Sequence, residues 1–278
     1  MPTIDSPLRY PGGKTQIAPF VGDLLRANDL DRGVYAEPFA GGAGVAWRLL
    51  FTGQVSEVWL NDIDSGIYSF WNSVLNDTAR LCKLIEETPI SMEEWHRQRS
   101  VVRRKNSSML SLGFATLFLN RTNRSGIIGA GVIGGKLQNG NYKMDCRFNK
   151  IELIEKIRRI EKYRDAVQLT QLDAKFCITQ WTKKLPDRAL LNIDPPYYTK
   201  GQALYTNFYE PKDHAVLADV IKKLKCPWML TYDDEPEIET LYSGFPTYRK
   251  SLVYYAQVKR HASELLVLSP QLLPPKDF

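Results

Sequence analysis

The chain has 278 residues, of which 44% are hydrophobic and 24% are charged, a composition typical of a soluble globular protein. The N-terminus has no apolar signal segment, and no later apolar run is long enough to predict a membrane helix. The three histidines and four cysteines lack the close spacing of metal-ligand or disulfide motifs. We therefore expect no metal site, no membrane span and a cytoplasmic location.

The formal net charge of +6 is unevenly distributed along the chain. Residues 80–164 hold 18 Lys and Arg against 8 Asp and Glu, a net of +10, whereas the remainder has a net of −4. Such segregation is the electrostatic footprint of a module that binds a polyanion. A solvated basic helical surface without a partner is the alternative that charge alone leaves open.

Short apolar runs that predict buried β-strands alternate with helical patterns. Strands are expected at 33–37, 57–60, 167–172, 189–193 and 228–232, with a terminal hairpin from 252–255 and 264–268. Helices are expected at 45–50, 151–163 and 213–224. This alternation predicts an α/β fold with a mostly parallel, doubly wound sheet.

Residues 66–165 interrupt the alternation with helical patterns and then a stretch rich in Gly and Asn. We expect 1–65 and 166–278 to form one catalytic domain, into which 66–165 is inserted as a mainly helical module. Ligands bind doubly wound sheets beyond the carboxyl ends of the strands. Acidic residues follow four of the predicted strands at these ends, namely Glu37, Asp62, Asp173 and Asp194.

The run Phe39-Ala-Gly-Gly-Ala-Gly44 lies where the first predicted strand turns into a helix. Glycine permits positive φ and a close approach of a ligand to the backbone, so Phe39 and Gly41 are candidate cofactor-binding residues. Asp62 follows the turn at the spacing of about 20 residues at which an acidic residue accepts ribose hydroxyls. The third glycine of the dinucleotide motif is missing, and Glu37 suits an ammonium group. The pattern therefore favours a positively charged cofactor over a dinucleotide.

The most informative run is Asn192-Ile-Asp-Pro-Pro-Tyr-Tyr198. Pro195 and Pro196 stiffen the backbone directly after a buried strand, so the Asp194 carboxylate and the Pro195 carbonyl present two acceptors in fixed geometry. With the aromatic face of Tyr197 beside them, they suit a planar substrate that bears an NH2 group. Hydrogen bonds that pull both protons out of the ring plane free the nitrogen lone pair to attack an electrophilic methyl group. A rigid surface turn without function is the alternative interpretation.

Four motifs occur in a specific order: Arg9-Tyr-Pro-Gly-Gly-Lys14, Glu37-Pro-Phe-Ala-Gly-Gly42, Asn61-Asp-Ile-Asp64 and Asp194-Pro-Pro-Tyr197. Together they resemble the Dam-like family of N6-adenine DNA methyltransferases. The resemblance implies a Rossmann-like methyltransferase fold, S-adenosylmethionine as cofactor and double-stranded DNA as substrate. A methyltransferase of this kind must flip the target base out of the duplex.

The resemblance also implies roles for individual residues. Asp62 is expected to hold the ribose, Asp173 to lie near the adenine edge, and Asp194 to face both the methionyl end and the target amine. Tyr197 is expected to stack on the flipped adenine. The implied cofactor-binding set, whose first two members come from the N-terminal motif, is Tyr10, Lys14, Glu37, Phe39, Gly41, Asp62, Asp173 and Asp194.

The stretch from 120 to 150 gives the basic module a candidate reading loop. Arg suits guanine and Asn suits adenine in the major groove, while Lys and Arg also hold phosphates. We expect DNA contacts from Asn120, Arg121, Asn123, Arg124, Lys136, Asn139, Asn141 and Lys143. The FNVP-like run typical of enzymes that read GATC is absent, so a GATC target is not expected.

Three alternatives stay open at this stage. An N4-cytosine DNA methyltransferase needs the same acceptor geometry, although the motif order and the N-terminal motif favour adenine. An RNA adenine methyltransferase is expected to lack a groove-reading loop. A non-catalytic nucleic-acid-binding protein with a relict fold would tolerate loss of Asp194 or Tyr197, and both are present. The resemblance fits a bacterial, archaeal or phage-encoded enzyme, with a cognate restriction endonuclease as a compatible partner.

Overall fold

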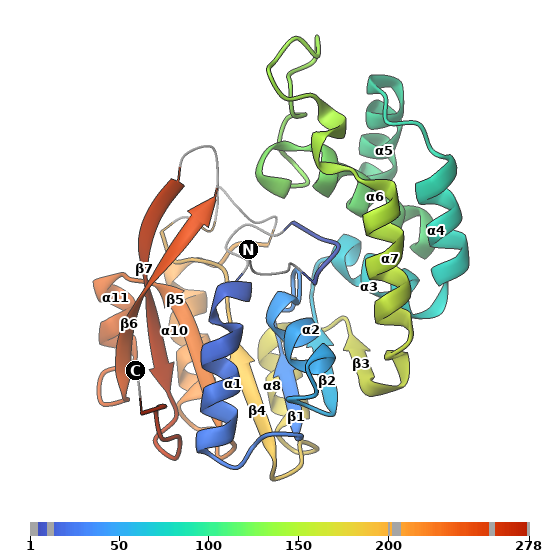
Figure 1. Ribbon diagram of the computed structural model, residues 1–278. Helices are drawn as coiled ribbons and strands as arrows, with labels where there is room; N and C mark the ends of the chain where they lie inside the picture. Colours follow the sequence, from blue (N-terminus) through green and yellow to red (C-terminus); the bar gives the residue numbers. More distant parts are fainter. Residues whose placement is uncertain (1–4, 10–13, 200, 202–206, 256–258, 277–278) are drawn as a thin grey trace. The chain divides into compact units, whose positions relative to one another are not determined.

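The computed structural model describes residues 5–9, 14–199, 201, 207–255 and 259–276 (Figure 1). These residues fall into two compact units, the first within 14–63 and 166–278 and the second within 5–9 and 64–165. The second unit thus includes a segment of the N-terminal region that we expected in the catalytic domain. This segment belongs to the second unit because the side-chain amide of Asn120 holds its backbone. The amide donates to the Arg9 carbonyl and accepts from the Arg9 N–H, both at 2.7 Å.

The first unit is built on one twisted sheet. In the part of the chain that the structure describes, seven strands pair in the order β3-β2-β1-β4-β5-β7-β6. Their bounds are β1 (Val34–Glu37), β2 (Glu57–Asn61), β3 (Val167–Thr170), β4 (Ala189–Ile193), β5 (Trp228–Asp233), β6 (Thr247–Tyr255) and β7 (Lys259–Leu268). β1 to β5 are parallel, whereas β7 runs antiparallel to both β5 and β6. The predicted mostly parallel α/β sheet with a terminal hairpin is confirmed.

The strand order reverses direction at β1, which pairs with β2 on one side and with β4 on the other. Such a switch point opens a crevice at the carboxyl ends of the strands, where ligands bind in doubly wound sheets. Glu37 ends β1 and Asp233 ends β5, while Asp62 and Asp194 directly follow β2 and β4. The fold therefore gathers acidic side chains at one edge of the sheet.

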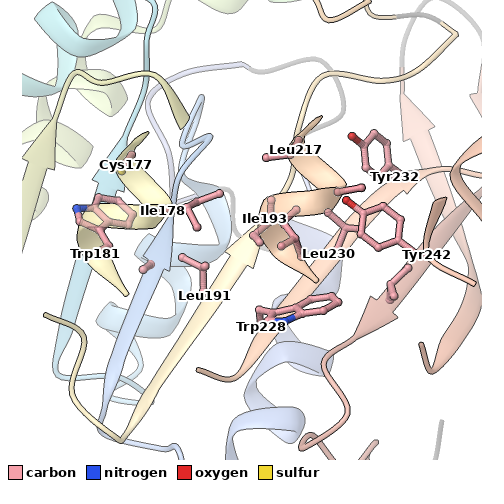
Figure 2. Packing of buried hydrophobic residues seen from close by; sticks show 14 of the residues in the cluster. Cys177, Ile178, Trp181, Leu191, Ile193, Leu217, Trp228, Leu230, Tyr232 and Tyr242 are labelled. Atoms are coloured by element: carbon pink, nitrogen blue, oxygen red, sulfur yellow. The ribbon is translucent and has the colours of Figure 1, made fainter. Parts of the chain in front are cut away.

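Helices cover both faces of this sheet (Figure 1). On one face lie α1 (Ala18–Ala27) and α2 (Gly44–Phe51), and on the other α8 (Ala174–Trp181), α10 (Pro211–Ile221) and α11 (Pro236–Leu241). Figure 2 shows the second face, where Leu191 and Leu230 of the sheet pack against Ile178 and Leu217 of the helices. All four are completely buried, and each contributes about 2 kcal/mol of hydrophobic stabilisation. This core fixes the strand ends that carry the acidic residues.

The second unit is helical. It contains α3 (Ser65–Asn76), α4 (Thr78–Glu87), α5 (Met92–Arg103), α6 (Met109–Thr122) and α7 (Lys150–Glu161). Side chains of Asp64, Ser91, Ser108 and Asn149 accept N–H bonds at the starts of α3, α5, α6 and α7, as helix-capping residues do. α6 is buried over most of its length and forms the centre of the unit. None of the described helices is long and apolar enough to span a membrane.

α3 and α6 approach each other closely at Gly113. A Cβ atom at this position would lie 2.5 Å from the Ser69 carbonyl oxygen and 2.9 Å from the Phe70 Cα. Neither backbone atom can yield without moving α3. The absence of a side chain at Gly113 is therefore what permits the two helices to pack.

Gly113→Ala is expected to destabilise the second unit by about 1–3 kcal/mol through overpacking, despite the higher helix propensity of alanine. Gly22→Ala in α1 is the matched control, because its Cβ would meet only the movable side chain of Gln54. Thermal unfolding followed by circular dichroism measures both. Equal midpoints for the two variants would contradict the close packing at Gly113.

Candidate functional site

A buried ion-pair network lies at the carboxyl ends of the strands. The Lys14 ammonium contacts Asp194 Oδ1 at 2.6 Å and Glu264 Oε2 at 2.8 Å, and the lysine side chain is 3% exposed. Burial alone would lower the pKa of Lys14, but the two carboxylates raise it above its ordinary value. Lys14 therefore stays charged. We call Lys14, Asp194, Tyr197 and Glu264 the Lys14 cluster.

Asp194 is held on one of its two oxygens. The Thr231 hydroxyl donates to Oδ1 at 2.8 Å, and the same oxygen accepts from Lys14. Both of these bonds end on Oδ1, no described residue donates a hydrogen bond to Oδ2, and the side chain is 30% exposed. The backbone beyond the two prolines is also held, because the Asp233 carboxylate accepts from the N–H groups of Tyr198 and Thr199 at 2.9 and 3.2 Å. Two residues of β5 thus hold this turn: Thr231 bonds the Asp194 side chain, and Asp233 bonds the backbone that follows the prolines.

Tyr197 is held by two other members of the Lys14 cluster, Glu264 and Lys14. Its hydroxyl donates to Glu264 Oε1 at 2.8 Å, and the Lys14 ammonium lies 5.4 Å from the centre of its ring. Only 7% of the residue is exposed, so it presents a small part of its surface to a ligand. Glu264 was not predicted from the sequence, since it stands at the start of an apolar strand run with no motif around it.

Glu37 brings a second carboxylate close to Asp194. Burial raises the pKa of Glu37 to about 8, the charge of Asp194 adds to the rise, and the side chains of Tyr35 and Asn192 oppose it. A carboxyl group with this pKa is mostly protonated at neutral pH. A cation bound beside it would favour the ionised form.

The glycine turn is tied to the end of β2. Asp62 Oδ2 accepts from the Gly41 N–H at 2.9 Å, and Gly41 has a positive φ of 45°. The side-chain amide of Asn61 donates to the carbonyls of Pro38 and Leu172, both at 3.0 Å, which joins the turn to the segment after β3. Because these bonds fix the backbone, the turn keeps its shape without a ligand. Phe39 beside it is half-buried.

The remaining predicted cofactor residues are placed less centrally. Asp173 is exposed and caps α8 by accepting from the N–H groups of Lys175 and Phe176 at 3.1 and 3.3 Å. Tyr10 lies outside the described residues. The structure thus places Glu37 within the electrostatic influence of Asp194, which pairs with Lys14, while Asp62 is bonded to the glycine turn. Within the described chain no group of His, Cys, Asp and Glu has the arrangement of a metal site.

In the second unit, two predicted DNA contacts are buried and serve the fold instead. Asn120 is 1% exposed, and besides pairing with Arg9 its amide donates to the Gly126 carbonyl at 2.8 Å. Asn123 is fully buried, where it accepts from the Trp95 indole at 2.7 Å and donates to the Ile128 carbonyl at 2.8 Å. Their side chains are satisfied by the protein itself. The prediction that they read bases is therefore withdrawn.

Arg121 is also engaged within the unit. Its guanidinium donates to the Pro7 carbonyl at 2.7 Å, and burial together with the charge of Arg9 lowers its pKa to about 10. The other predicted contacts remain at the surface. The exposed members of the set are Arg124, Lys136, Asn139, Asn141 and Lys143.

The sheet order, with antiparallel β7 inserted between β5 and β6, and the acidic strand ends define the class of S-adenosylmethionine-dependent methyltransferases. A family model, that of the D12 class N6 adenine-specific DNA methyltransferases, matches residues 10–255. The chain belongs to this family of enzymes, whose methyl donor is S-adenosylmethionine. A comparison with curated proteins found no match.

Solved structures with a related fold share little sequence with this chain. One is a SAM-dependent methyltransferase from Agrobacterium tumefaciens, with 10% identity over 92% of this chain and 62% of that chain and a TM-score of 0.42. Another is precorrin 8W decarboxylase from Methanobacterium thermoautotrophicum, with 11% identity over 91% and 88% of the two chains and a TM-score of 0.36. The chain spans 62% of the length of the Agrobacterium protein.

The pKa of Glu37 predicts a pH-dependent stability. Because the folded protein holds a proton on Glu37 up to about pH 8 and an unfolded glutamate loses it near 4.5, stability is expected to fall as pH rises through this window. Glu37→Gln removes the titration and is expected to be more stable than wild type at pH 9, by on the order of a few kcal/mol. Thermal unfolding of both proteins from pH 5 to 9 tests this. Parallel curves would show that Glu37 is not the group responsible.

Proposed function

We propose that this chain transfers a methyl group from S-adenosylmethionine to N6 of an adenine in double-stranded DNA. The observation that supports the proposal most is that the Asp194 carboxylate is held in a fixed orientation. Lys14 and Thr231 hold one of its oxygens, and the two prolines behind it fix the backbone. A rigid acceptor of this kind suits a planar amine, and the family of the chain acts on adenine N6.

The residues present fit S-adenosylmethionine, which carries a sulfonium, an ammonium group and a ribose. Glu37 is buried and becomes more favourable in its ionised form beside a cation, so we assign it to the ammonium group. Asp62 would hold the ribose, and Phe39 and Gly41 would line the cofactor along the turn. Asp173, at the next strand end, would lie near the adenine edge. Lys14 would act through its ion pair with Asp194.

When bound, S-adenosylmethionine would supply the methyl group as an electrophile, with its sulfur as the leaving group. Asp194 Oδ2 and the Pro195 carbonyl would accept hydrogen bonds from the two N6–H groups and turn the nitrogen lone pair out of conjugation with the ring. Asp194 then takes the proton that N6 must lose and passes it to solvent, which reaches its partly exposed side chain. Tyr197 would stack on the flipped adenine.

For target recognition we propose the inserted module at 66–165, with 1–65 and 166–278 as the catalytic domain except for 5–9, which belong to the second compact unit. Extruding a base costs a few kcal/mol of stacking and pairing, which contacts to the rest of the duplex must offset. The exposed Lys136 and Lys143 suit phosphates, and the exposed Asn139 and Asn141 suit adenine edges. A cognate restriction endonuclease and a cytoplasmic location stay predictions of the sequence.

The direct test is transfer of a tritium-labelled methyl group from S-adenosylmethionine to duplex DNA, RNA or free nucleosides, followed by nucleoside chromatography. Label in N6-methyladenine from duplex DNA is expected. Label in N4-methylcytosine, or in RNA alone, would refute the proposed substrate.

Asp194→Ala removes the acceptor that the mechanism requires, so methyl transfer is expected to fall by at least about 10³-fold. DNA binding, measured by fluorescence anisotropy, is expected to stay within about threefold of wild type because the contact surface lies on other residues. Asp219→Ala, at an exposed position of α10, is the control and should retain full activity. Substantial transfer by Asp194→Ala would remove this residue from the mechanism.

Lys136→Ala combined with Lys143→Ala is expected to weaken duplex binding for all sequences alike. Loss of two phosphate contacts lowers the slope of log K against log salt concentration by about 1.8. Anisotropy titrations at several salt concentrations measure this slope, with Lys83→Ala on α4 as an exposed control outside the loop. An unchanged slope would mean that neither lysine touches a phosphate.

A further inference from the structure

Glu264 is a buried carboxylate that neither the motifs nor the family match explains. It lies on β7, beyond residue 255 at which the family match ends. Its side chain is 3% exposed, and its strand pairs it with Asp233 of β5. Because β7 runs antiparallel to β5, the first half of β7 reaches the carboxyl edge of the parallel strands, where Asp194 lies. A buried glutamate is costly unless charged or hydrogen-bonding partners compensate it.

The two oxygens of Glu264 contact two other members of the Lys14 cluster, Lys14 and Tyr197. Oε2 lies 2.8 Å from the Lys14 ammonium, and Oε1 accepts from the Tyr197 hydroxyl at 2.8 Å. One side chain thus holds both a cation that contacts Asp194 and a ring that follows it in the turn. Asp194 itself is not in contact with Glu264 in these bonds, so any effect on it passes through Lys14 and Tyr197.

The charges explain why a second carboxylate is needed. Lys14 and Asp194 alone would form a neutral pair. The ammonium would then offset the whole negative charge of Asp194 and weaken Asp194 as a hydrogen-bond acceptor. With Glu264 the cluster has two negative formal charges against one positive. In a buried site these charges are weakly screened. The excess negative charge is complementary to the positive charge that reaches N6 with the methyl group.

We propose that Glu264 is a positioning residue for methyl transfer, which balances the charge of Lys14 and orients Tyr197 so that Asp194 keeps its acceptor strength toward the target amine. This inference rests on the proposed function. It places a functional carboxylate on the terminal hairpin, outside the motif-bearing segments.

Glu264→Gln tests the charge, because glutamine keeps the size and can still accept from the Tyr197 hydroxyl. The single-turnover rate of methyl transfer to duplex DNA is expected to fall 10- to 100-fold, with the Kd values for S-adenosylmethionine and DNA within about threefold of wild type. Glu237→Gln on α11 makes the same chemical change at an exposed position and is expected to leave the rate unchanged. Glu264→Asp keeps the charge on a shorter side chain and is expected to retain more of the rate than Glu264→Gln; a rate no higher than that of Glu264→Gln would contradict the role of the charge.

A double-mutant cycle tests the route through Lys14. If Glu264 acts by balancing that charge, Glu264→Gln introduced into Lys14→Gln is expected to lower the rate much less than in wild type. A rate within twofold of wild type for Glu264→Gln alone, or an equal fall in both backgrounds, would overturn the proposal.

The Lys14 ammonium gives a readout that does not need activity. Titration of the isotope-labelled lysine by NMR is expected to show a lower pKa in Glu264→Gln and no change in Glu237→Gln, because Glu264 is one of the two carboxylates that raise it. An unchanged Lys14 pKa would overturn the inference. Should wild type transfer no methyl group to DNA, the proposed function fails by that result, and the NMR titration decides the role of Glu264 in the cluster.

Discussion

The burial of the Lys14 ammonium is the constraint on which the rest of the catalytic unit depends. An ammonium out of water costs several kcal/mol unless carboxylates meet it in good geometry. Its partners, Asp194 after β4 and Glu264 on β7, come from segments far apart in the chain. Removing either would leave the ammonium with one carboxylate in place of two, and so with weaker compensation for its burial. The N-terminal motif, the Pro-Pro turn and the terminal hairpin are therefore energetically one site, although the sequence separates them.

The buried carboxyl group of Glu37 lowers the free energy of unfolding when it is ionised. Glu37 is buried near Asp194 and its pKa rises to about 8, so the stability that its ionisation costs is lost as pH rises from about 4.5 to about 8. Evolution tolerates such groups where a ligand relieves them, and strongly shifted pKa values therefore gather at functional sites. In the proposed roles, the ammonium group of the cofactor would stabilise the ionised form of Glu37, and its sulfonium would complement the negative charge of the Lys14 cluster. A neutral or anionic cofactor would do neither, which agrees with the methyl donor of the family.

The sheet was predictable because each strand is a short apolar run, and the strand-end acids follow those runs directly in the sequence. The runs at 57–60 and 189–193 correspond to β2 and β4, and Asp62 and Asp194 follow them. Glu264 was not predictable in the same way. Its place beside Lys14 results from the antiparallel return of β7 against β5, a pairing of distant segments that no local pattern encodes. Strand direction, more than residue type, made it part of the site.

The asparagines of the second unit show where residue type alone gave a wrong prediction. The side chain of Asn is equally suited to an adenine edge and to a buried backbone carbonyl, so composition alone assigned Asn120 to DNA. Its position at the end of the apolar run in α6 was the available sign of burial. The exposed lysines and asparagines of the predicted DNA-contact set lie on both sides of Gln138 in the sequence. The side-chain amide of Gln138 donates to the carbonyls of Ile133 and Gly135 and accepts from the Met144 N–H. These bonds order the backbone of the loop before any contact with DNA. In the proposed role in DNA binding, a loop ordered in advance would lose less conformational entropy on binding, so a few exposed lysines and asparagines would suffice.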